Sequence, residues 1–259
     1  MNKFIIFTTL LLTGFLTAQI KENRDVADFS KLKASSSVQV FYTISNTKSV
    51  QVETDDAEKM QYIKTEVIGE TLNIYLDSNK KGTSKKSKNR KWKNTFNFKV
   101  LKITVSGPNL KAVKASSSAD VNFVNTNKSS SLEVVVSSSG SVSGSFDCSD
   151  LLIEASSSGD FAGTITAVTV DIKASSSGDV VLKGKAKNLI VKASSSSDCE
   201  LKNLAVEKAT IEASSSADVE VTVTASVDAK ASSSADVVIY GNPVNVSKEV
   251  SSSGSVSLR

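Results

Sequence analysis

Apolar and polar residues alternate along most of this chain, and the alternation is clearest in its second half. Leu151, Ile153 and Ala155 alternate with polar neighbours, and Val170, Ile172 and Ala174 do the same one repeat later. A period of two is typical of a half-buried β-strand, whereas an amphipathic helix would show a period near 3.6. No helical pattern of comparable length interrupts these segments, so the chain is predicted to be all-β.

The strands belong to an internal repeat. The motif [AV]-S-S-S-[AGS]-[DS]-[VFC] recurs eight times at intervals of 18 to 21 residues, starting at Ala115, Val136, Ala155, Ala174, Ala193, Ala213, Ala231 and Val250. A ninth copy at Ala34 lacks the acidic position. A constant short period indicates one structural unit stacked on copies of itself. We therefore predict a right-handed parallel β-helix, a solenoid with rungs of about 19 residues.

Stacking turns equivalent residues into columns along the solenoid. The position three residues before each serine triplet forms an apolar spine, which becomes charged only at the last rung: Val113, Val134, Ile153, Ile172, Val191, Ile211, Ala229 and then Lys248. If the alternation continues through the triplet, the middle serine and the following small residue point inward, and the aspartate points outward. Inward serines could then hydrogen-bond along their own column. A corner inside the triplet, at the small residue, fits the pattern equally well.

The first 107 residues are less regular. Residues 20–107 are predicted to form an N-terminal β cap region with hairpins, which leaves 108–259 for the regular repeats. Alternating segments occupy 38–44, 49–53, 62–68, 71–76 and 96–105, and residues 56–59 could form one helical turn. A basic loop at 78–95 interrupts this region.

The N-terminus has the pattern of an export signal. A short basic start precedes an apolar run from Phe4 to Leu16, and small residues follow it. Residues 1–19 are therefore expected to be a signal peptide. The rest of the chain has no other long apolar run, so we expect no transmembrane span in the mature chain. The exported protein is expected in the periplasm, on the outer-membrane surface or in the medium.

The residue composition excludes several kinds of catalytic and metal-binding site. The chain has 46 serines, two cysteines and no histidine, which excludes Ser-His-Asp and Cys-His catalysis and any imidazole metal site. The rungs vary by only three residues in length, so they leave no long loops to build a catalytic cleft. We expect no enzyme and no cofactor. Cys148 and Cys199 lie on rungs that are not adjacent and are expected to be reduced and buried.

Charge is concentrated in the basic loop. The net charge is +4, and eight positive charges without an acid lie between positions 80 and 93, so the remainder carries 4 − 8 = −4. The candidate anion-binding residues are Lys80, Lys81, Lys85, Lys86, Lys88, Arg90, Lys91, Trp92 and Lys93. They could bind a cell-surface glycan or lipopolysaccharide, or form a solvated loop. An exported protein is not expected to bind nucleic acid.

A second candidate is a column of outward carboxylates. Its members are Asp120, Asp160, Asp179, Asp198, Asp218 and Asp236, interrupted by Ser141 and Ser255. Carboxylates at strand spacing repel one another, and calcium could bridge them. Alternatively, each aspartate sits at a turn, accepts backbone hydrogen bonds and is screened by water.

Residues 157–160 and 176–179 carry Gly-Ser-Gly-Asp-like motifs, and the stretches 62–74 and 236–243 are equally distinctive. With these features the sequence resembles a known family, the putative auto-transporter adhesin, head GIN domain proteins of the Bacteroidetes. The resemblance covers roughly residues 28 to 257 and implies an exported β-helical protein. The family offers no catalytic residues to carry over.

These observations lead to two functional hypotheses. The first is an exported, non-enzymatic binding or adhesion module of the cell surface or periplasm. The alternative is a structural, self-assembling solenoid that packs through its serine-rich face or its ends and forms homo-oligomers.

Overall fold

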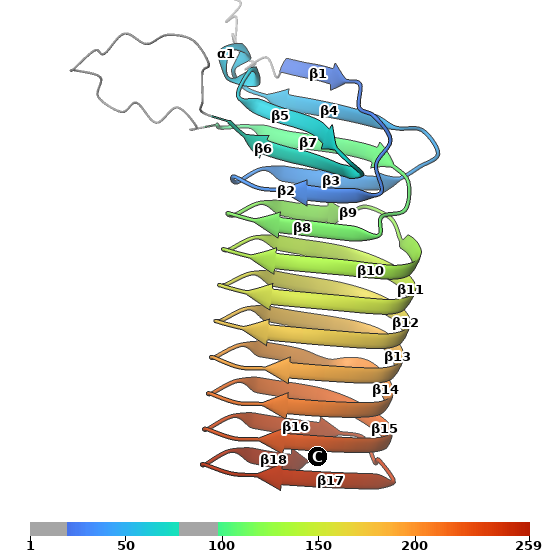
Figure 1. The fold of residues 1–259 in the computed structure, drawn as a ribbon, viewed down its shortest axis with the longest axis vertical. Coiled ribbons are helices and arrows are strands. Elements are labelled where there is room, and N and C mark those ends of the chain that lie inside the picture. Colours follow the sequence, from blue (N-terminus) through green and yellow to red (C-terminus); the bar gives the residue numbers. More distant parts are fainter. Residues whose placement is uncertain (1–19, 78–97) are drawn as a thin grey trace, which may run out of the picture.

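A computed structural model describes residues 20–77 and 98–259 of the chain, which coil into an elongated stack (Figure 1). Its strands belong to one 18-stranded sheet, and the described part holds a single four-residue helix. The elements are β1 (Ile20–Arg24), β2 (Lys31–Ala34), β3 (Gln39–Ile44), β4 (Ser49–Thr54), α1 (Ala57–Met60), β5 (Ile63–Ile68), β6 (Thr71–Leu76), β7 (Leu101–Gly107), β8 (Ala112–Ser116), β9 (Asp120–Phe123), β10 (Asn127–Ser137), β11 (Ser141–Ser156), β12 (Asp160–Ser175), β13 (Asp179–Ala193), β14 (Asp198–Ala213), β15 (Asp218–Ala231), β16 (Asp236–Tyr240), β17 (Asn245–Val250) and β18 (Ser255–Leu258).

Each regular coil is flat and has two faces. In β12 the residues Asp160–Ala167 pair with β11 and β13 on one face, and Thr169–Ala174 pair with the same neighbours on the other. All pairings from β8 to β18 are parallel. The chain advances as a right-handed coil (Figure 1), which is the sense that parallel crossover connections prefer. The predicted fold class is therefore confirmed.

The hydrophobic core fills the space between the two faces. Inward residues of the regular coils are buried almost completely, and the outward ones are exposed or half-buried. The predicted spine is present in register from Val113 to Ala229. It continues toward the N-terminus through Leu32 and Leu72 and ends on exposed Lys248, which pairs with Ala229.

The N-terminal coil is not at the end of the stack. Strands β2 and β3 pair with β8 and β9 on one side and with β6 and β7 on the other. The segment from β4 to β7 therefore folds back over the first coil and covers it. The antiparallel pairs β1–β4, β4–β7 and β5–β6 form this cap, and α1 lies where a helical turn was predicted.

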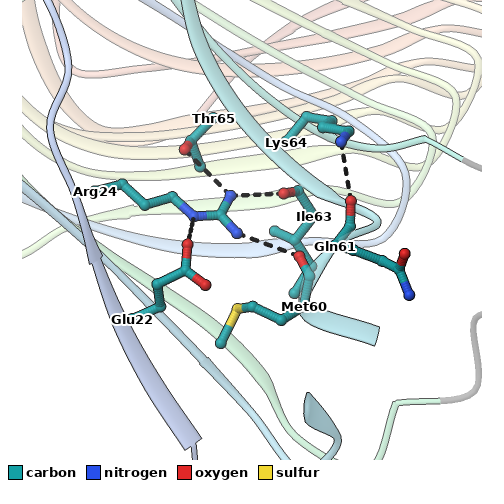
Figure 2. A network of polar contacts seen from close by, with 7 residues as sticks. All are labelled: Glu22, Arg24, Met60, Gln61, Ile63, Lys64 and Thr65. Atoms are coloured by element: carbon teal, nitrogen blue, oxygen red, sulfur yellow. Dashed lines mark hydrogen bonds and ion pairs between the residues drawn. The ribbon is translucent and has the colours of Figure 1, made fainter. Parts of the chain in front are cut away.

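One arginine holds the pieces of the cap together (Figure 2). From β1, Arg24 donates hydrogen bonds to the carbonyl oxygens of Ile63 and Met60, at 2.6 and 3.2 Å, and to Thr65 Oγ1 at 3.3 Å. Its Nε donates to Glu22 Oε1 at 2.7 Å. The guanidinium uses its donors within the chain, so we assign Arg24 a structural role and not a ligand-binding one.

Both cysteines are buried and unpaired, as predicted. Burial raises the pKa of the Cys148 thiol to about 11 and that of the Cys199 thiol to about 12, so neither is a reactive thiolate at neutral pH. Among the described residues, no helix has the length and apolar character needed to cross a membrane.

The spine provides a test of the alternation. Ile172 is fully buried between Ile153 and Val191, whereas its neighbour Lys173 faces solvent. We expect Ile172→Asp to lower the free energy of unfolding by at least about 4 kcal/mol, because it buries an unpaired charge.

Lys173→Asp should cost at most about 1 kcal/mol, the value of the exposed ion pair with Glu154 that it breaks. Urea denaturation followed by circular dichroism measures both. Equal losses at the two positions would contradict the assignment of inward and outward faces.

Candidate functional site: the serine edge

Every regular coil turns sharply at its serine triplet, and the stacked turns form one long edge of the solenoid. We call this surface the serine edge. It consists of the nine triplets at 35–37, 116–118, 137–139, 156–158, 175–177, 194–196, 214–216, 232–234 and 251–253. The degenerate copy at 35–37 thus belongs to the same edge as the eight complete motifs.

The turn requires an unusual backbone. In one coil the N–H of Gly159 donates to the carbonyl oxygen of Ser156 at 3.0 Å, across Ser157 and Ser158. Both central serines are left-handed, with φ of 52° and 58°. Among the described residues, the only non-glycine residues with positive φ are the second and third serines of the nine triplets. Left-handed backbone costs an L-residue roughly 1–2 kcal/mol, so the stack must compensate for this cost repeatedly.

Backbone hydrogen bonds between turns supply that compensation. The third serine of each turn donates its N–H to the carbonyl oxygen of the second serine in the next coil, as Ser158 does to Ser176 at 3.1 Å. Eight such bonds, 2.8 to 3.1 Å long, connect the nine turns. The carbonyl oxygen of the second serine and the N–H of the third serine are therefore paired between neighbouring turns along the edge.

The residue after the triplet is small because it approaches the previous coil. A Cβ atom added to Gly159 would lie 2.6 Å from the carbonyl carbon of Val136, which is closer than atoms can pack. Ser197 uses the same position differently: its hydroxyl donates to the carbonyl oxygen of Ala174 at 3.2 Å and accepts from the N–H of Ser194 at 3.1 Å. Both side chains and backbone are thus packed tightly behind the turn.

The predicted orientation of the middle serine is wrong. Ser157 and its equivalents in the eight complete motifs are exposed, and the hydroxyls form no interior column. Two successive left-handed residues reverse the chain, so the period-two alternation stops at the first serine and resumes at the small residue. The alternative prediction, a corner at the small residue, is nearer to the structure. The corner in fact lies at the second and third serines, and the small residue after them is buried.

The predicted carboxylate column runs beside the serine edge. Asp160, Asp179, Asp198, Asp218 and Asp236 pair in register on successive coils. Asp120 lies beyond Ser141, whose hydroxyl donates to its Oδ1 at 2.7 Å. Five carboxylates therefore lie next to one another, with no lysine or arginine between them in the column.

Burial and repulsion make two carboxyls of this column, Asp160 and Asp198, harder to ionise. Burial raises the pKa of Asp160, and the charge of Asp179 adds to the effect. The pKa of Asp198 is raised first by burial and then by neighbouring carboxylates, of which Glu200 contributes most. Within residues 20–77 and 98–259, no three acidic, cysteine or histidine side chains are placed to hold a metal ion together.

The other side of the serine edge carries paired charges. Lysines and glutamates on adjacent coils form ion pairs there: Lys114–Glu133, Lys173–Glu154, Lys192–Glu212 and Lys230–Glu249, with separations of 2.9 to 3.7 Å. Cross-strand pairs of this type add modestly to sheet stability. The serine edge therefore has a neutral border on one side and an acidic border on the other.

The predicted anion-binding residues from Lys80 to Lys93 lie outside the described part of the chain, so their placement stays a prediction. In the sequence these residues lie between β6 and β7, both of which belong to the cap region.

The stacked coils and their repeated polar edge define an all-β solenoid of the repeat-protein class. More specifically, the chain belongs to the family described as putative auto-transporter adhesin, head GIN domain, whose model matches residues 28–243. No curated protein matches the chain.

Solved structures show the same fold. A putative adhesin from Parabacteroides merdae has a TM-score of 0.80 at 14% identity, with 93% of this chain and 96% of that chain covered. A putative lipid binding protein from Parabacteroides distasonis has a TM-score of 0.78 at 23% identity, again with 93% of this chain and 96% of that chain covered. A putative adhesin from Bacteroides fragilis has a TM-score of 0.63 at 22% identity, covering 93% and 97%.

The left-handed turn can be tested at Ser176. Ser176→Val should lower stability by about 1–2 kcal/mol, because a β-branched residue is strained at positive φ. Ser176→Gly should stay within about 0.5 kcal/mol of the parent, since relief of strain offsets the larger entropy of the unfolded chain. Chemical denaturation of both variants gives the comparison. A valine variant as stable as the glycine variant would disprove the turn conformation.

The acidic column predicts a pH dependence. A carboxyl whose folded pKa exceeds its unfolded pKa adds stability at low pH, and that contribution is lost as the pH rises through the folded pKa. Asp198→Asn should therefore raise the melting temperature at pH 7, and the gain should vanish below about pH 3.9, the ordinary aspartate pKa.

Asp150→Asn is the matched control, since Asp150 is exposed outside this column. Thermal melts of both variants from pH 3 to pH 7 measure the difference. A lower melting temperature for Asp198→Asn at pH 7 would show that the ionised column stabilises the fold.

Proposed function

We propose that this chain is an exported, non-enzymatic binding and adhesion module of the cell surface or periplasm. The observation that carries the proposal is the serine edge, which repeats one polar surface on nine successive turns. The description of the family as adhesins agrees with it. A rigid array of identical groups suits attachment to a repetitive partner better than it suits catalysis.

The chemistry of the serine edge favours a polyhydroxylated polymer. Each serine hydroxyl can donate one hydrogen bond and accept two, and the aspartate column adds acceptors along the border. Equivalent groups recur about every 4.8 Å, the spacing of adjacent strands. Single contacts of this kind are weak, but many acting together give avidity to a glycan chain.

The basic loop supplies a second element of the proposal. Its eight positive charges would attract anionic glycans or lipopolysaccharide, and such attraction weakens as salt increases. The lipid binding named for the Parabacteroides distasonis neighbour widens the range of partners to amphiphiles of the bacterial surface.

The alternative of a self-assembling solenoid has one specific argument for it and one against it. Strand β17 is exposed along its whole length, so the last coil of this chain offers backbone groups to a neighbour. However, Lys248 occupies the spine position there, and an inward-facing charge discourages strand pairing across an open end. A monomer in sedimentation analysis favours adhesion, whereas a stable end-to-end dimer favours the structural role.

Loop deletion tests the adhesion proposal. Replacing residues 78–95 by a short glycine linker should abolish the salt-sensitive binding of residues 20–259 to anionic glycans or lipopolysaccharide on an array. The melting temperature should change little, because shortening a surface loop costs little entropy.

A companion variant, Ser158→Ala with Ser177→Ala and Ser196→Ala, removes three neighbouring hydroxyls from the serine edge. It should weaken binding to neutral glycans and leave the salt-sensitive binding intact. If the loop deletion binds as well as the parent, the loop is a solvated spacer. If neither variant changes any binding, the adhesion surface has been assigned wrongly.

A further inference from the structure

The corner opposite the serine edge has a different shape. In β12 the buried residues Ala167 and Val170 enclose two outward residues, Val168 and Thr169, so the alternation slips by one and the strand bends. The pairing with β11 skips Val168 and its partner Ser149 at this point. The same bend recurs on each neighbouring coil, and the bends align along the solenoid.

The aligned bends form a groove of about 940 Å³, which we call the corner groove. It extends across coils from β10 to β15, and its floor consists of small side chains, namely Cys148, Ala167, Ala186 and Val206. Six coils at a strand spacing of about 4.8 Å give a groove roughly 24 Å long. Its volume lies within the range of small-molecule sites.

The floor is apolar and reachable from outside. Cys148, Ala167 and Ala186 are 7%, 8% and 5% exposed, whereas the spine residues Ile153 and Ile172 are 0% exposed. Val168 stands at the wall with 44% of its surface exposed. An exposed apolar wall above a small-residue floor is a place where an apolar ligand would gain by leaving water.

The corner groove does not suit a peptide strand or a stacked sugar. The backbone groups on both sides of each bend are already paired between adjacent coils, so no free strand edge is available. Of the residues that the structure describes, none with an aromatic ring lines the groove. A flexible acyl chain needs neither, since it is bound by shape and by removal of apolar surface from water.

One lysine at the rim would determine where the charged end of an anionic ligand binds. Lys185 lies between Thr166 and Ala205 on the adjacent coils, so no carboxylate faces it there. The other lysines of the rim have acidic neighbours. Lys128 Nζ lies 3.8 Å from Asp147 Oδ2, and Lys187 lies on the coil next to the one that carries Glu207. An anionic head group would therefore be favoured at Lys185.

We propose that the corner groove binds one anionic amphiphile, with its acyl chain along the floor and its carboxylate or phosphate at Lys185. None of the lining residues of the corner groove belongs to the serine triplets or to the segment 78–95. If the groove binds no amphiphile, the adhesion proposal is unaffected. If the adhesion proposal fails, the groove proposal is likewise unaffected.

The experiment uses residues 20–259 and laurate as the probe. Isothermal titration should give one laurate per chain, and laurate should displace a fluorescent fatty acid such as cis-parinaric acid. Val168→Glu places a carboxylate against the chain and should weaken binding at least about tenfold. The matched control is the identical substitution Val124→Glu, at a 63% exposed valine outside the groove, which should leave the affinity unchanged.

The head group is tested separately. Lys185→Gln should weaken laurate about fivefold, the effect of a partly exposed ion pair, and should not change binding of uncharged dodecanol. Lys33→Gln removes a lysine of β2 and should have no effect. Ser149→Trp, at an exposed wall position, should block both ligands while the circular dichroism spectrum stays that of the parent.

Three results would overturn the proposal. The first is no saturable laurate binding by the parent protein. The second is an equal loss of affinity in the Val168 and Val124 variants, which would show adsorption elsewhere. The third is binding to laurate-containing vesicles without binding to the monomeric ligand, which would indicate a membrane-surface contact instead of a groove.

Discussion

The left-handed serine turn sets the geometry of every coil. Two successive residues at positive φ reverse the chain within a few atoms, and the turns then bond to one another through their backbones. That bonding keeps the two faces of each coil in register, so inward columns such as the spine follow from it. Without the hydrogen bonds between turns, one coil could shift in register relative to the next. The inward residues of neighbouring coils would then no longer align in columns.

The two narrow edges of the solenoid carry different chemistry because their backbones differ. At the serine edge the left-handed turn pushes short polar side chains outward and leaves acids beside them. At the opposite corner an ordinary bend leaves small apolar residues near the surface, with Lys185 on the rim. Of the two flat faces between them, one carries charges paired across coils and the other carries the aspartate column. One scaffold therefore presents a hydrophilic array and an apolar groove that do not compete for space.

Much of this fold could be predicted from the sequence, because a period of about 19 residues and strict alternation leave few other arrangements. The spine from Val113 to Ala229 appears in the structure as expected. The orientation of Ser157 was missed, since alternation was extended through a turn whose backbone is not extended. The corner groove was missed because Cys148, Ala167 and Ala186 look like ordinary core residues. Their signal was the recurrence of small residues one position before the bend.

The backbone ladder at the turns also makes length an adjustable property of this molecule. Each coil meets its neighbours through the same contacts, so a coil gained or lost as a unit preserves every kind of interaction that the remaining coils make. The molecule would then grow or shrink in steps of about 4.8 Å. Duplication of a single 19-residue segment is thus a conservative change here, whereas insertion of one residue into a strand is not. The length of the solenoid can therefore be altered without redesigning the core.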